Sequence, residues 1–102
     1  MTTQSPNTED ARWADLARHY HLRLPRRDSR MSVRRAWTRS GLSVEDFYEW
    51  SGFKRTADFK TANPDWTPRA ICGLALEYRA EKDGLGPYAP YAAQSLGTEP
   101  ML

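Results

Sequence analysis

The chain has 102 residues, which allows one domain and not two. Its 15 basic and 13 acidic residues nearly balance, and a single cysteine, Cys72, excludes an intrachain disulfide and a cysteine-built zinc cluster. No apolar run is long enough to span a bilayer and the first ten residues are too polar to predict a signal peptide, so we expect a cytoplasmic protein with no membrane partner.

The first predicted element is a helix that follows a polar segment, residues 1–7, for which we expect disorder. Thr8 is placed to cap this helix. The apolar residues that recur with helical spacing on one face are Trp13, Leu16, Ala17 and Tyr20. The helix should fade near His21 or Leu22, because Pro25 cannot continue it.

The arginine segment, residues 23–39, comes next. It holds seven arginines, one aspartate and no lysine, so its charge of +6 exceeds the +2 of the whole chain. Residues 23–30 predict a connecting segment, and a second helix should start at Ser29 or Ser32 and end by Gly41. The apolar face of this second helix is formed by Val33, Ala36 and Trp37.

A third helix is marked at both ends. Ser43 is an N-cap residue, and Asp46 three positions later approximates a capping box. Leu42 before the cap and Phe47 inside the helix predict a hydrophobic staple. Gly52 suits the residue just after the helix, which often takes a left-handed conformation.

Two more helices are expected before the tail. Thr56 can cap a short fourth helix that stops at residues 63–64, an Asn-Pro pair. Thr67 caps a fifth, whose apolar residues include Ile71, Leu74, Ala75 and Tyr78. Because this helix is so apolar, we expect it to be the central packing element. Gly73 inside it predicts a close crossing of helices. Residues 83–84, Asp-Gly, should end it.

The helical periodicities, without any strand pattern, predict an all-α fold: a compact bundle of about five short helices. We expect one helical domain over residues 8–84 and an extended or disordered tail over residues 85–102. The tail holds prolines and glycines but no periodic apolar residues.

The sequence offers no set of catalytic residues. His19 and His21 are two positions apart, so a helix would point them to different sides. Cys72 lies among apolar residues, which is typical of a buried thiol. We therefore expect neither an enzyme nor a bound metal or cofactor.

Residues 43–62 resemble a helix-turn-helix motif, because a helix, a turn with Gly52, an apolar Phe53 and a second helix follow one another. The resemblance implies that the second helix enters the major groove of DNA. The residues expected to contact the groove are Lys54, Arg55, Thr56 and Lys60. Those expected to bind phosphates are Arg26, Arg27, Arg30, Arg34 and Arg35. This predicts a small regulator or accessory factor of a phage, plasmid or bacterium, and a homodimer is compatible with it.

Two other interpretations stay open. In the first, the arginines pair with the protein's own carboxylates, namely Asp10, Asp15, Glu45 and Glu49. In the second, the chain is a non-enzymatic adaptor or inhibitor that docks on a partner protein through an arginine and tryptophan surface and the tail. The residues expected to bind that partner are Trp37, Arg39, Tyr88 and Tyr91.

Overall fold

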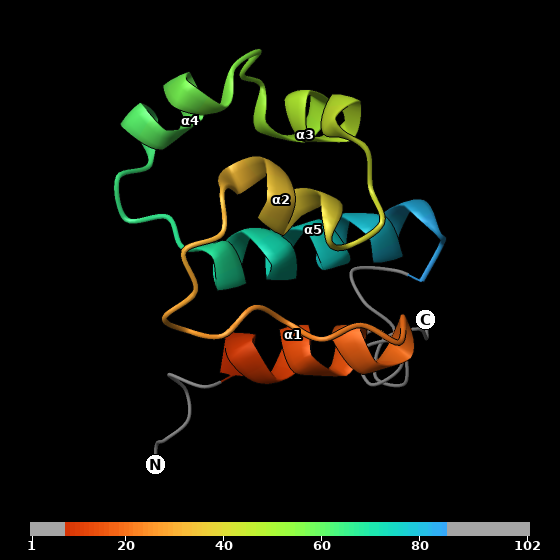
Figure 1. Cartoon of the computed structure of the whole chain (residues 1–102). Helices are drawn as coiled ribbons and strands as arrows, with labels where there is room; N and C mark the ends of the chain where they lie inside the picture. Colours follow the sequence, from red (N-terminus) through yellow and green to blue (C-terminus); the bar gives the residue numbers. More distant parts are fainter. Residues whose placement is uncertain (1–7, 86–102) are drawn as a thin grey trace.

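In the computed structural model, which describes residues 8–85, the chain folds into five α-helices with no strand in that range (Figure 1). They are α1 (Thr8–His19), α2 (Val33–Thr38), α3 (Val44–Ser51), α4 (Thr56–Ala62) and α5 (Pro68–Lys82). The all-α prediction is therefore confirmed. The predictions for residues 1–7 and for most of the tail lie outside the described residues.

The longest helix, α5, packs on one side against α1 and on the other against α2, which in turn contacts α3 (Figure 1). Two clusters of buried side chains result. The first lies between α1 and α5 and is built around Trp13, Leu16 and Leu76. The second joins α2, α3, α4 and α5 around Trp37, Phe47, Phe59 and Ile71. The predicted role of α5 as the central packing element is thus confirmed.

Gly73 marks the closest approach between α1 and α5. A Cβ atom on this residue would lie 2.1 Å from Cδ2 of Trp13, far inside van der Waals contact. The indole of Trp13 therefore packs flat against the backbone of α5, where only glycine leaves room. The close helix crossing that the sequence predicted at Gly73 is confirmed.

The end of α1 lies earlier than predicted. The helix stops at His19, and His21 takes a left-handed conformation with φ of 59°. The amide of His21 donates to the carbonyl of Arg18, and that of Leu22 donates to the carbonyl of Ala17 at 2.7 Å. These bonds form a Schellman motif, which closes the helix before Pro25 could disturb it.

The helix starts follow the sequence signals with two corrections, of which the first is that Thr8 is the first residue of α1 and not its cap. At α3 the capping box between Ser43 and Asp46 is complete, as predicted. Of the two candidates for the start of α2, the structure selects Ser32, whose side chain accepts from the amide of Arg35. Thr56 does not cap α4: it is the first residue of that helix, and the cap position is held by Arg55, whose side chain makes no capping bond.

The last helix ends as predicted, at Asp83 and Gly84, in a second Schellman motif. Gly84 has a φ of 79°, and the amide of Leu85 donates to the carbonyl of Ala80 at 2.9 Å. Leu85 then packs against the cluster between α1 and α5. The packed unit therefore includes residue 85, which the sequence assigned to the tail.

Candidate nucleic-acid interface

Several acidic side chains form hydrogen bonds or ion pairs with other side chains of the protein, and some of these partners lie on α5. Arg69 donates from Nε and Nη2 to the two carboxylate oxygens of Asp10 at 2.6 and 3.2 Å, and from Nη1 to the carbonyl of Pro25 at 2.8 Å. This fork of hydrogen bonds lowers the pKa of Asp10 below its usual range. One arginine of α5 thus ties α1 and the connector, residues 20–32, to the core.

Further polar contacts hold α1 and α3 against α5. Glu77 accepts from the indole nitrogen of Trp13 at 2.8 Å and also pairs with Arg12. Lys82 donates to Asp46 at 3.0 Å, and this bond contributes most to lowering the pKa of the Asp46 carboxyl. These carboxylates are therefore not available to neutralise the arginine segment.

A second group of basic side chains has no such partners. Within residues 8–85, six exposed arginines and lysines of the connector, α2 and the α3–α4 turn make no ion pair with any carboxylate. They are Arg23, Arg30, Arg34, Arg35, Lys54 and Arg55. The hypothesis that the arginine segment serves the protein's own carboxylates therefore fails for most of its members.

The remaining predicted DNA contacts are placed differently. Arg27 pairs with Asp10 at 3.4 Å, and Arg26 pairs with Asp28 at 3.6 Å, although both arginine side chains stay largely exposed. Lys60 lies 5.9 Å from the ring centre of Trp66. Thr56 is half-buried at the start of α4. Arg26, Arg27 and Lys60 are exposed, so three of these four side chains can contact a ligand.

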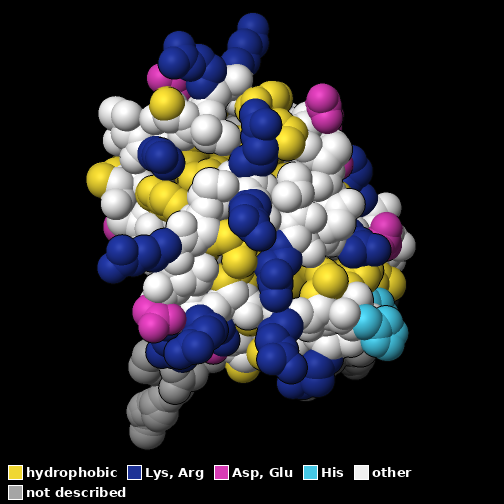
Figure 2. All heavy atoms as spheres, viewed as in Figure 1, with side chains coloured by type: hydrophobic (Ala, Val, Ile, Leu, Met, Phe, Trp, Pro, Cys, Tyr) yellow, Lys and Arg dark blue, Asp and Glu magenta, His cyan; other side chains and the backbone are white. Residues whose placement is uncertain are grey.

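Basic side chains are frequent on the face of the molecule that Figure 2 shows. Figure 2 shows Lys and Arg side chains in a column that runs down one face, from the α3–α4 end over α2 to α1, while acidic side chains lie toward the edges of the view. We call this surface the basic face. Because α2 packs on α5, the arginines on the outer side of α2 have a rigid base.

The motif-like segment folds as a helix, a turn and a helix. Gly52 has a φ of 80° in the turn, and the rings of Phe47 and Phe53 lie 5.2 and 6.0 Å from that of Phe59, which joins α4 to α3. The exposed side of α3 carries Glu45 and Glu49. Of the two helices, only α4 contains a basic residue, Lys60, and Lys54 and Arg55 precede its start.

Of the residues expected to dock on a partner protein, the structure describes Trp37 and Arg39, and these two have different surroundings. Trp37 is 0% exposed, and its indole nitrogen donates to the carbonyl of Ser43 at 2.8 Å. This corrects the prediction of a tryptophan docking surface: the ring fills the core because α2 presents it to α3 and α5. Arg39 is exposed, whereas Tyr88 and Tyr91 lie outside the described residues.

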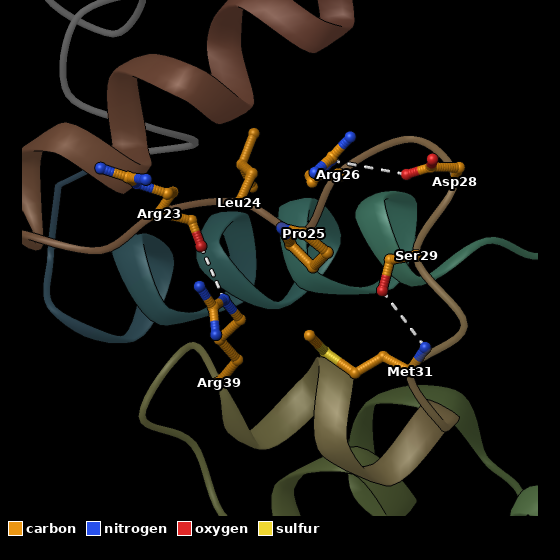
Figure 3. Close-up of a pocket in the computed structure, with 8 residues that line it drawn as sticks. All are labelled: Arg23, Leu24, Pro25, Arg26, Asp28, Ser29, Met31 and Arg39. Atoms are coloured by element: carbon orange, nitrogen blue, oxygen red, sulfur yellow. Dashed lines mark hydrogen bonds and ion pairs between the residues drawn. The ribbon is translucent and has the colours of Figure 1, made fainter.

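A hollow of about 420 Å³ lies between the connector and α2 (Figure 3). Figure 3 shows Pro25 and Met31 facing each other across it, with the guanidinium of Arg39 at one side and Ser29 at the other. The remaining residues that line it are Arg23, Leu24, Arg26 and Asp28. Sequence analysis missed Arg23 and Met31 as site residues, although both lie inside the arginine segment that it singled out.

No arrangement suited to metal or thiol chemistry is found in the part of the chain that the structure describes. No three His, Cys, Asp or Glu side chains among residues 8–85 come together as metal ligands. Cys72 is buried in α5, and burial raises the pKa of its thiol to about 11. None of the described helices is both long and apolar enough to cross a membrane.

Comparison of the chain with family models, with curated proteins and with solved structures found no match. The functional argument therefore rests on the charges, contacts and shape of this molecule alone.

Proposed function

We propose that this chain is a small, non-enzymatic DNA-binding protein that holds a duplex against its basic face. One observation carries the proposal: six exposed arginines and lysines of the connector, α2 and the α3–α4 turn have no carboxylate partner among residues 8–85. Evenly spread phosphates are the natural counter-charge for such a surface, and their binding releases condensed counterions. Arginine suits the task because its planar fork donates two hydrogen bonds to one phosphate.

The arrangement of the helices supports a division of roles on this face. Arg34 and Arg35 stand on α2, which packs on the core, so they suit fixed contacts to the DNA backbone. Lys54 and Arg55 lie in the α3–α4 turn, where a helix-turn-helix protein approaches the groove. The acidic outer side of α3 excludes α3 itself as the groove-reading helix. We therefore assign phosphate contacts to α2 and groove contacts to the start of α4.

The test is a titration of the protein against random-sequence duplex DNA at two salt concentrations. Affinity should fall steeply with salt, with a slope in log–log form of about 0.9 for each phosphate contacted. Replacing Arg34 and Arg35 together by Gln should weaken binding to all sequences and reduce that slope by about 2. Arg55→Gln should instead reduce the preference among sequences.

A matched control is Arg18→Gln, which removes an exposed arginine of α1 that already pairs with Asp15. It should leave both affinity and salt slope nearly unchanged. If the duplex does not bind at low salt, or binds with no salt dependence, the proposal is overturned. The basic face would then suit an acidic protein partner, with Arg39 as the one described residue of the adaptor hypothesis that remains exposed.

A further inference from the structure

The hollow beside α2 has a composition that differs from the rest of the basic face. Its floor is apolar: Pro25 and Leu24 are buried, and Met31 is half-buried. Leu24 belongs to the cluster between α1 and α5, whereas Met31 packs on the cluster around Trp37. The hollow therefore sits where the two core clusters meet, and its apolar floor is formed by residues that the fold itself fixes.

The polar side chains around that floor offer hydrogen-bond donors. Arg39 donates from Nε to the carbonyl of Arg23 at 2.6 Å, and no other hydrogen bond from its guanidinium is present among residues 8–85 (Figure 3). The two Nη groups thus form a pair of donors with no acceptor in the described part of the chain. Ser29 Oγ accepts from the amide of Met31, and its own hydroxyl proton has no acceptor in the described part of the chain.

Positive charge exceeds negative charge among the side chains at the rim. Asp28 is the one acidic residue there, and it already pairs with Arg26 at 3.6 Å. Neither Arg23 nor Arg39 makes an ion pair among residues 8–85. A ligand in the hollow therefore meets uncompensated positive charge and donors at one end and apolar side chains below.

We propose that this hollow is a binding site for a small organic anion, with its carboxylate on the Nη edge of Arg39 and its apolar body on Pro25 and Met31. The volume of about 420 Å³ lies within the range of small-molecule sites, which are mostly apolar with a few polar groups that fix orientation. A carboxylate matches the free donor pair because it accepts two parallel hydrogen bonds from one guanidinium. The site goes beyond the proposed DNA binding and does not depend on it.

The first experiment compares two ligands that differ only in charge: 3-phenylpropanoate and its neutral amide, 3-phenylpropanamide. Each is titrated into the ¹⁵N-labelled full chain without DNA, and the amide signals of Ser29, Met31 and Arg39 are followed by NMR. The carboxylate should shift these signals in a saturable way and bind about tenfold more tightly than the amide. No saturable shift at these residues, or equal binding of both compounds, would overturn the proposal.

The second experiment removes the donor pair. Arg39→Gln should weaken carboxylate binding about tenfold and bring it to the level of the neutral amide. Arg35→Gln is the matched control, because Arg35 is another exposed arginine of the same segment that does not line the hollow. If the two variants lose affinity equally, the effect is one of overall charge, and the assignment of the carboxylate to Arg39 is wrong. The ligand comparison on the unmodified chain stands even if Arg39→Gln does not fold.

Discussion

The charged side chains of α5 and those of the basic face have opposite surroundings. On α5, Arg69, Glu77 and Lys82 each contact an oppositely charged side chain of α1 or α3. On the basic face, Arg34 and Arg35 contact no carboxylate among residues 8–85. The same chemical groups thus stabilise the fold in one region and remain free for a ligand in the other.

The difference shows that the position of a charge, and not its residue type, decides its role. Asp10 and Arg69 are only about a quarter exposed, at 25% and 22% of their side chains, so their hydrogen bonds replace lost contacts with water. Arg34 and Arg35 are exposed, and exposed charges generally contribute little to stability. Changes in the α1–α5 interface should therefore alter stability, and changes on the basic face should alter binding alone.

The largest effect is expected where α1 and α5 come closest. Gly73→Ala places a Cβ atom 2.1 Å from the indole of Trp13, which has to move or to push the helices apart. We expect the free energy of unfolding to fall by about 3 kcal/mol, measured by urea denaturation followed by tryptophan fluorescence. Gly84→Ala is the control: space is open there, and only the φ of 79° opposes it, at a cost of about 1 kcal/mol. Equal losses in the two variants would contradict the close crossing.

Two charge removals test whether the paired charges stabilise the fold more than the charges of the basic face do. Asp10→Asn takes the carboxylate from the Arg69 fork and should lower the free energy of unfolding by about 1–2 kcal/mol. Arg34→Gln should change it by less than about 0.5 kcal/mol, because the guanidinium of Arg34 makes no ion pair among residues 8–85. The same denaturation curves measure both variants. If Arg34→Gln lowered the free energy of unfolding as much as Asp10→Asn, the basic face would also stabilise the fold.

We expect acid to weaken the interaction between Asp10 and Arg69. The hydrogen bonds from Arg69 place the pKa of folded Asp10 below its value in the unfolded chain, which is about 3.9. The contribution of this pair is therefore complete above that value and is lost as the pH falls through the lower, folded pKa. We expect the free energy of unfolding to drop on acidification below about pH 4. Asp10→Asn should show a shallower drop, and an unchanged slope in that variant would remove Asp10 as a cause.

The smallest effect is expected at the end of α1. His21 holds a left-handed conformation with φ of 59°, which strains any residue with a Cβ atom. His21→Gly relieves that strain and should raise the free energy of unfolding by about 0.5–1 kcal/mol, without any change in DNA affinity. His19→Gly, inside the helix, is the control and should destabilise the protein instead. If the two variants change stability in the same direction, the Schellman ending of α1 is wrong.

Local signals predicted much of the fold. Ser43 with Asp46, and Thr67 before Pro68, specified helix starts because a cap needs only residues within one turn. Two helix ends were predicted wrongly because their local signals are weak. His21 takes a left-handed conformation that glycine usually adopts, and Arg55 precedes α4 without a side-chain cap. Leu22 packs against the cluster between α1 and α5, and Phe59 belongs to the cluster around Trp37, so tertiary packing adds to the local contacts at both helix ends.

Residue spacing, caps and local charge predict the helices, the central position of α5 and the concentration of arginine in residues 23–39, because these are properties of neighbouring residues. Which charged side chains pair with one another depends on the packing of distant segments. Asp10 lies 59 positions from Arg69 along the chain, and no local pattern shows that this arginine of α5 occupies it. Helix packing brings Asp10 and Asp46 to basic partners on α5, whereas Arg34 and Arg35 make no ion pair among residues 8–85, because pairing depends on distances that the packing of helices creates.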